Sequence, residues 1–143
     1  LSDEPSVLRI NNIIMNRVKR YRDSYMDSDE GFIKNWPQNT NLYGWIIELN
    51  KGGNLRSHMH KLGWLSGSLY LQLKKIPKSN QGNIVFDLHG ADYPKDSKIF
   101  PNIEFDIEQG DIILFPSSIF HKTIPFDLDE NRITLAFDIK PIY

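Results

Sequence analysis

The sequence contains no cysteine, and this absence removes several kinds of chemistry at once. Disulfide bonds, thiolate catalysis and cysteine-ligated zinc sites all need a residue type that the chain does not have. An excess of one charge is missing too, because 17 basic residues stand against 18 acidic ones and leave a formal net charge of −1. Proteins that bind nucleic acid usually carry a basic excess, so this balance argues against nucleic acid as a partner.

Long apolar runs are also missing. No segment approaches the roughly 20 apolar residues that cross a bilayer, so we expect no membrane partner. The segment Leu1 to Pro5 has neither a basic nor an apolar region, so it forms no signal peptide, and we expect a cytoplasmic protein. Because the sequence lacks an initiator methionine, we also expect a processed form or a piece of a longer protein.

The composition is that of one ordinary globular domain. The 143 residues are 40% hydrophobic, 12% aromatic and 24% charged, and a chain of this length can bury a sizeable core. We therefore predict a single domain over residues 1–143, with a helical lead-in at about 5–36 and a β-rich part at about 42–140.

The lead-in is predicted to begin with a helix from Pro5 to about Met26, and Phe32 to Trp36 could add one more turn. Apolar residues recur in this helix at three- or four-residue steps and form one stripe opposite the charges. The stripe consists of Val7, Ile10, Ile14, Val18, Tyr21 and Tyr25.

From Leu42 onward, short runs rich in β-branched and aromatic residues alternate with turn signals. The predicted strands are Leu42–Leu49, Leu55–Met59, Trp64–Leu73, Asn83–Leu88, Asn102–Ile107, Asp111–Phe115, Phe120–Ile124 and Ile133–Ile139. Short strands at this spacing favour an all-β sandwich or barrel. The fold that fits best is a mostly β jelly roll, a double-stranded β-helix, with the leading helix packed on its outside.

Three of the four histidines fall where a metal could bind them. His58 and His60 are two positions apart, and on an extended strand such residues project to the same face. His121 comes 63 residues after His58, and a jelly roll places distant strands side by side. Imidazole is the commonest metal ligand among side chains, and three can occupy one face of an octahedral iron. Two exposed histidines and one buried one are the alternative.

Polar residues on two predicted strands could bind an organic ligand. Arg132 and Thr134 share one face of the last strand, where a guanidinium and a hydroxyl would make a clamp for a carboxylate. An arginine that faces water at a sheet edge is the alternative. A second polar face, which could line a cavity or face solvent, consists of Ser66, Ser68, Tyr70 and Gln72. The segments Trp36–Asn41 and Gly90–Asp96 are expected to flank the mouth of the site.

These motifs follow one another in a fixed order along the chain. The order is His58-x-His60, Leu65–Leu71 (LSGSLYL), Gly110–Ser117 (GDIILFPS), His121–Phe126 (HKTIPF) and Arg132-x-Thr134. The set resembles the 2-oxoglutarate-dependent, Fe(II)-dependent oxygenases, and more narrowly a bacterial and phage branch with the pattern H-x-H, H and R-x-T. The resemblance runs from about Leu42 to Ile139.

The resemblance implies a non-haem Fe(II) dioxygenase that uses 2-oxoglutarate and O₂. Oxidative decarboxylation of 2-oxoglutarate would be coupled to hydroxylation of a small-molecule or peptidyl substrate. His58 and His121 match iron ligands, and His60 stands where the wider superfamily has a carboxylate. His60 could bind as a third imidazole, Asp87 could supply the carboxylate instead, or the position could be left to water or an anion.

The resemblance also implies a site for the cosubstrate. Arg132 matches the basic residue that pairs with the distal carboxylate of 2-oxoglutarate, and Thr134 matches its hydroxyl partner. Tyr70 and Ser68 lie on the strand where the family often places a further 2-oxoglutarate contact.

Two other classes of protein stay open, because fold does not determine function. One is a cupin-like three-His metal dioxygenase that does not use 2-oxoglutarate, in which Arg132 holds a substrate carboxylate. The other is a non-catalytic β-sandwich binding domain.

Overall fold

The computed structural model describes residues 3–90, 93–94 and 99–143, and its first element is the predicted helix. Helix α1 covers Pro5–Ser24. It begins there because the Glu4 carboxylate accepts hydrogen bonds from the backbone N–H groups of Ser6 and Val7, both at 3.0 Å, and because proline suits the first helical position. A single turn, α2 (Gly31–Lys34), follows at the place predicted for an extra turn. In the described part of the chain, neither helix is long and apolar enough to cross a membrane.

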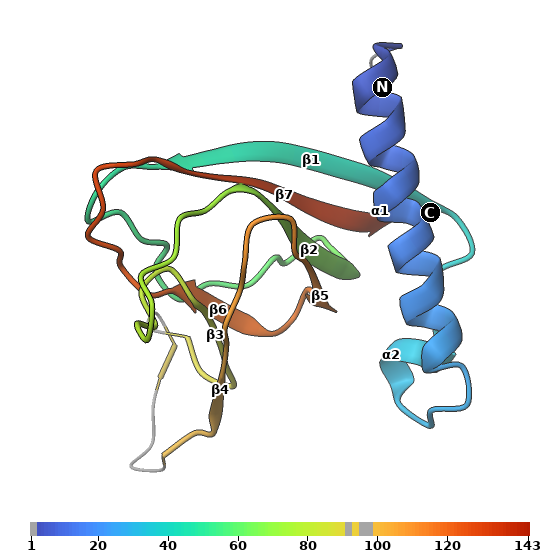
Figure 1. Cartoon of the computed structure of the whole chain (residues 1–143). Coiled ribbons are helices and arrows are strands. Elements are labelled where there is room, and N and C mark those ends of the chain that lie inside the picture. The colour runs from blue at the N-terminus through green and yellow to red at the C-terminus, as the bar shows by residue number, and fades with distance from the viewer. Residues whose placement is uncertain (1–2, 91–92, 95–98) are drawn as a thin grey trace.

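The strands of the described residues form two antiparallel sheets (Figure 1). The four-stranded sheet has the order β1 (Thr40–Leu49), β7 (Arg132–Pro141), β2 (Leu65–Gln72) and β5 (Ile112–Pro116). The three-stranded sheet has the order β4 (Asn102–Phe105), β3 (Ile84–Asp87) and β6 (Phe120–Thr123). Strands far apart in the sequence are therefore neighbours, as the predicted jelly roll requires.

One predicted strand is wrong. The segment Leu55–Met59 is irregular and touches β6 through an isolated bridge between His58 and His121. His58 and His121 exchange both backbone hydrogen bonds. Three residues earlier, the backbone N–H of Leu55 donates to the side chain of Thr123 and not to a backbone carbonyl, although Thr123 is only two residues after His121. A regular ladder needs an even step on both strands, and this segment does not supply it.

Two apolar clusters lie on opposite faces of the four-stranded sheet. Side chains alternate along β7, so Phe137 and Ile139 point outward, where Ile14 and Val18 of α1 pack against them. Figure 1 shows α1 beside the end of the sheet at which β7 finishes. The second cluster lies between the two sheets and contains Tyr70, Leu73, Ile84, Phe86, Ile107 and Phe115. The opposite face of β7 is thus free to carry polar groups into the space between the sheets.

The close packing of β2 against Phe137 gives a test of the fold. A Cβ atom at Gly67 would lie 2.4 Å from Cζ of Phe137 and 2.7 Å from the carbonyl oxygen of Ile113. We expect Gly67→Ala to lower the free energy of unfolding by about 1–3 kcal/mol, because the ring must shift. Urea unfolding measures this change, with Gly31→Ala as the control, since its nearest neighbour would be Asn35 Nδ2 at 3.8 Å. A wild-type unfolding midpoint for Gly67→Ala would contradict this packing.

Candidate metal centre and ligand pocket

The structure brings three histidines together. His58 and His60 come from the irregular segment before β2, and His121 comes from β6. One ring nitrogen of each lies within 4.8 Å of the others, and the Nε2 atoms of His58 and His60 are 3.3 Å apart. Two nitrogen ligands at about 2.1 Å from one ion and at right angles to each other lie roughly 3 Å apart, so this spacing suits a single ion.

In each of the three rings, the Nδ1 atom lies within hydrogen-bond distance of an oxygen atom. The Nδ1 contacts are to the Arg56 carbonyl for His58 (2.7 Å), the Ile119 carbonyl for His121 (3.3 Å) and the Asp138 carboxylate for His60 (2.6 Å). Carbonyl and carboxylate oxygens only accept hydrogen bonds, so the proton of each neutral ring lies on Nδ1. This tautomer leaves each Nε2 lone pair free to bind a metal.

His121 is the most buried of the three rings, with 6% of its surface exposed. Burial lowers its pKa to about 3, and the neighbouring His58 adds to this effect. The ring is therefore neutral at neutral pH, which is the form that binds metals.

Asp138 is a residue of this centre that the sequence interpretation missed. Its Oδ1 also accepts a hydrogen bond from Ser66 Oγ at 2.7 Å, and that hydroxyl lies 2.7 Å from Ser117 Oγ. Burial by itself raises the pKa of Asp138, but the hydrogen bonds from His60 and Ser66 outweigh burial and hold it below its usual value. The sequence does indicate which way Asp138 points. On β7, alternate residues share a face, so Asp138 lies on the same face as Arg132, Thr134 and Ala136.

Asp87, the alternative carboxylate, lies outside the group of three histidines. It is the last residue of β3, and its Oδ1 accepts a hydrogen bond from the backbone N–H of His89 at 3.1 Å. The neighbouring Phe86 points into the core between the sheets, so alternation along β3 turns the Asp87 side chain to the other face.

A cavity of about 310 Å³ opens beside the three rings. Its apolar wall is formed by Trp45, Ile47, Leu49, Leu55, Ile84 and Ala136. Its polar lining, besides the histidines, consists of Ser68, Tyr70, Thr123, Arg132 and Thr134. The structure therefore places all four residues predicted for a carboxylate site, Ser68, Tyr70, Arg132 and Thr134, around the same cavity as the histidines.

Arg132 is almost completely buried, with 3% of its surface exposed. One Nη1 hydrogen bond goes to the carbonyl oxygen of Gly82 at 2.8 Å, and the guanidinium carbon lies 5.1 Å from the centre of the Tyr70 ring. Its Nε is buried without a hydrogen-bond partner among the described residues. Burial lowers the pKa of this guanidinium. A buried donor of this kind at a cavity wall is what an anionic ligand would satisfy.

The Tyr70 hydroxyl is a second buried polar group at the cavity without a hydrogen-bond partner among the described residues. It lies close to the side chains of Ser68 and Arg132 but forms no hydrogen bond of normal geometry with a described residue. Burial raises the pKa of Tyr70 to about 12, although the positive charge of Arg132 counteracts this. Tyr70 therefore keeps its proton at neutral pH and can donate it to a ligand.

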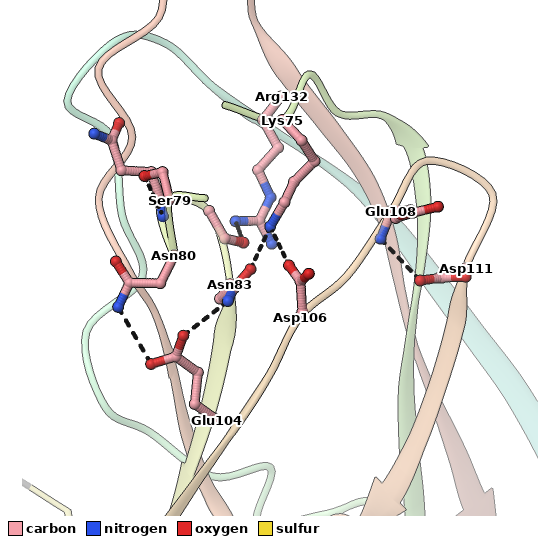
Figure 2. A network of polar contacts seen from close by, with 11 residues as sticks. Lys75, Ser79, Asn80, Asn83, Glu104, Asp106, Glu108, Asp111 and Arg132 are labelled. Atoms are coloured by element: carbon pink, nitrogen blue, oxygen red, sulfur yellow. Dashed lines mark hydrogen bonds and ion pairs between the residues drawn. The ribbon is translucent and has the colours of Figure 1, made fainter. Parts of the chain in front are cut away.

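A polar network holds the loop that contacts Arg132 (Figure 2). Lys75 bridges Asn83 and Asp106, and the Asn83 side chain donates to Glu104 at 2.8 Å. Asn83 directly follows Gly82, whose carbonyl accepts from Arg132. The network thus fixes the acceptor that orients the guanidinium.

Three expected positions differ from the structure or lie outside it. Gln72 does not share the cavity face with Ser68 and Tyr70, because a register shift after Tyr70 turns its amide toward the Asn131 carbonyl at 2.8 Å. The ring of Trp36 packs near Tyr21 and Phe32 on the helical side of the sheet, so Trp36 does not flank the cavity. Most of Gly90–Asp96 lies outside the described residues.

Comparison with known proteins agrees with this geometry. Residues 43–138 match the model of a protein family described as "Putative 2OG-Fe(II) oxygenase". No curated protein sequence matches the chain. Members of this family use Fe(II), 2-oxoglutarate and O₂, and the three histidines and buried arginine are residue types that suit such a set.

Several solved structures have a similar fold. HygX from Streptomyces hygroscopicus with iron bound is 15% identical, with a TM-score of 0.57, and the match covers 74% of this chain and 60% of HygX. A prolyl-4-hydroxylase from Pseudomonas putida is 16% identical, with a TM-score of 0.54, and the match covers 72% of this chain and 53% of that protein. This chain thus spans 53–60% of the length of these two proteins. The likeness confirms the predicted fold, and the match over residues 43–138 shows that the chain belongs to the 2OG-Fe(II) oxygenase family.

Proposed function

We propose that this protein is a non-haem Fe(II) dioxygenase that couples the oxidative decarboxylation of 2-oxoglutarate to the hydroxylation of an organic substrate. The observation that carries the proposal is a single cavity with two chemically different parts. Three imidazoles with free Nε2 atoms form one part, and a buried arginine with an unpartnered donor forms the other. A metal ion would bind to the three imidazoles, and the carboxylate of a ligand would accept a hydrogen bond from the arginine.

In this proposal His58, His60 and His121 hold Fe(II) through Nε2. The oxygen atoms at their Nδ1 positions fix the tautomer and the orientation of each ring before the metal arrives. Bound Fe(II) supplies the activation of O₂ that side chains cannot provide. The protein contributes the positions of the ligands and a partly enclosed cavity.

Arg132 is proposed to bind the distal carboxylate of 2-oxoglutarate. Its fork of donors can make two parallel hydrogen bonds to a carboxylate, and Thr134 and Tyr70 can add hydroxyl donors. Ser68 lines the same wall. The apolar residues opposite would exclude water from the reacting groups, which strengthens every electrostatic contact inside the cavity.

The three-imidazole set also favours a second candidate. Non-haem Fe(II) oxygenases commonly hold iron with two histidines and one carboxylate, whereas the group here consists of three histidines. By the motif resemblance, His60 takes the place of the carboxylate. A three-His dioxygenase that does not use 2-oxoglutarate would have the same ligands, and Arg132 would then hold a carboxylate of the substrate itself. A binding domain without turnover is the third possibility that the experiment below must separate.

The substrate is proposed to be a small molecule or a peptidyl side chain. A structure of HygX has been solved with nickel, 2-oxoglutarate and hygromycin B bound, so a protein of similar fold accepts an organic molecule beside the cosubstrate. The cytoplasmic location stays a prediction that cell fractionation would test.

Ligand selectivity tests the proposed cosubstrate. Protein loaded with Mn(II), which does not turn over, is titrated with 2-oxoglutarate, with glutarate, which lacks the keto group, and with 2-oxobutyrate, which lacks the distal carboxylate. We expect 2-oxoglutarate to bind at least roughly 10-fold more tightly than either analogue, because only 2-oxoglutarate satisfies both the metal and Arg132. Equal affinity for 2-oxoglutarate and glutarate would contradict the proposal and favour the second candidate. With Fe(II) and O₂, formation of succinate then separates an oxygenase from a binding domain.

A further inference from the structure

We propose that Asp138 is a positioning residue that gives His60 the negative charge which a carboxylate ligand would otherwise bring to the metal. The inference rests on the proposed metal centre and extends it to a residue that does not touch the ion. Three neutral imidazoles bring no negative charge to a metal ion, whereas two imidazoles and a carboxylate bring one.

The contact between Asp138 and His60 is short and buried. Oδ1 of Asp138 lies 2.6 Å from Nδ1 of His60, and 5% of the Asp138 surface is exposed. Hydrogen bonds to a charged acceptor are shorter and stronger than those between neutral groups. When an imidazole that binds a metal donates its other N–H to a carboxylate, the ring becomes more basic and its orientation is fixed.

No lysine or arginine of the described residues forms an ion pair with this carboxylate, and Lys140 acts on it only as a nearby positive charge. Among the described residues, the ion-pair contact of Asp138 is with His60, and its other hydrogen-bond donor is the neutral Ser66 hydroxyl. A buried charge is costly unless an opposite charge lies close to it. A divalent ion on the far nitrogen of His60 would supply that opposite charge through the ring.

The surroundings of Asp138 leave the carboxylate little freedom to move. Ser66 Oγ lies between Asp138 and Ser117, at 2.7 Å from each, and the Ser117 carbonyl accepts the backbone N–H of His60 at 3.0 Å. A Cβ atom at Gly63 would come within 2.4 Å of Ser117 Oγ and 3.2 Å of Asp138 Cγ. The same few residues thus hold both the ring and the carboxylate.

Strand β7 carries both charges of the proposed site on one face. Arg132 begins the strand and Asp138 follows six residues later, so both side chains point to the same side. The positive end faces the part of the cavity proposed for an anionic cosubstrate, and the negative end lies behind the proposed metal ligand His60. A site with three imidazoles and a nearby carboxylate has the same total charge as one with two imidazoles and a carboxylate ligand.

A double-mutant cycle tests the inference with Co(II), whose affinity is followed by its visible absorption. We expect Asp138→Asn to weaken Co(II) binding about 10–100-fold in the wild-type background, since asparagine can still accept the hydrogen bond but carries no charge. In the His60→Asp background the ligand has its own charge and no Nδ1, so the same change should alter affinity less than about 3-fold. Equal losses in both backgrounds would mean that Asp138 only supports the fold, and no loss in either would overturn the inference.

Asp87→Asn is the matched control, because Asp87 is a partly exposed aspartate at a strand end outside the histidine group. We expect it to keep the wild-type affinity for Co(II). Loss of affinity in Asp87→Asn together with wild-type affinity in Asp138→Asn would assign the charge to Asp87 and overturn the inference.

A metal-free measurement separates failure of this inference from failure of the metal site. Nitrogen-15 NMR of the unloaded protein reports the tautomer of His60, and we expect a proton on Nδ1 in the wild type and a mixture of tautomers in Asp138→Ala. If the wild type binds no Co(II), the proposed function fails, and the NMR result alone decides whether Asp138 positions the ring. If the wild type binds Co(II) and His60 has the same tautomer in both proteins, the inference fails and the metal site stands.

Discussion

Replacing His121 by alanine is expected to abolish tight binding of Fe(II), with a loss of affinity of more than roughly 100-fold. The loss should exceed that for a residue hydrogen-bonded to a ligand, which is about 10–100-fold, because a direct ligand disappears. The ring of His121 lies 4.3 Å from that of His58 and 5.1 Å from that of His60, between centres. The group has three members among the described residues, so it contains no fourth side chain to take the place of His121. Iron content after anaerobic dialysis measures the effect.

His89→Ala provides the control for this experiment. His89 is the remaining histidine, and its Nε2 lies 3.0 Å from the Tyr93 carbonyl oxygen, outside the group of three. We expect iron binding to be unchanged in this variant. Because the ring of His121 also packs 4.6 Å from that of Phe115, circular dichroism should establish that His121→Ala is folded. Wild-type iron affinity in folded His121→Ala would show that the ion is bound elsewhere.

Replacing Arg132 by alanine is expected to weaken 2-oxoglutarate binding by roughly 3–5 kcal/mol, which corresponds to a factor of about 150 to 5,000 in affinity. The guanidinium is buried, so its removal leaves the distal carboxylate of the ligand buried without a positive partner. Iron binding should be unaffected, because Arg132 is not part of the histidine group. Titration of 2-oxoglutarate into Fe(II)-loaded protein without oxygen measures the first quantity, and iron content after anaerobic dialysis measures the second.

Two further variants complete this test. Arg132→Lys should recover part of the affinity, because a point charge remains although the paired donors are lost. Arg17→Ala removes an exposed arginine of α1 and should bind 2-oxoglutarate like the wild type. If Arg132→Ala binds 2-oxoglutarate as tightly as the wild type, the carboxylate site lies elsewhere and the three-His dioxygenase becomes the better interpretation.

Much of the fold follows from patterns that the chain displays locally. The helix stripe predicts α1 to within two residues at its C-terminal end, and runs of β-branched and aromatic residues predict all the strands of both sheets. Alternation along β7 also predicts that Arg132 and Thr134 share a face, and both line the cavity. Such features depend on periodicity, which a sequence shows directly.

The features that were missed depend on contacts between distant residues. Leu55–Met59 has the composition of a strand, but it pairs with β6 unevenly. His58 and His121 exchange backbone hydrogen bonds, whereas the backbone N–H of Leu55 donates to the Thr123 side chain, so no regular ladder forms. Gln72 leaves the expected face because a register shift follows Tyr70, and nothing in the local sequence marks it. Alternation along β7 places Asp138 on the same face as Arg132 and Thr134, but it does not identify the partner of Asp138, His60, which lies 78 residues away in the sequence.

The most direct test of the proposed function is the absorption spectrum of Fe(II)-loaded protein when 2-oxoglutarate is added without oxygen. We expect a visible metal-to-ligand charge-transfer band in the wild type, because in the proposed function the keto acid binds the iron held by His58, His60 and His121. The band should be absent in His121→Ala and should need a far higher 2-oxoglutarate concentration in Arg132→Ala. If the wild-type protein binds iron but shows no band at saturating 2-oxoglutarate, 2-oxoglutarate is not the cosubstrate and the proposed function is wrong.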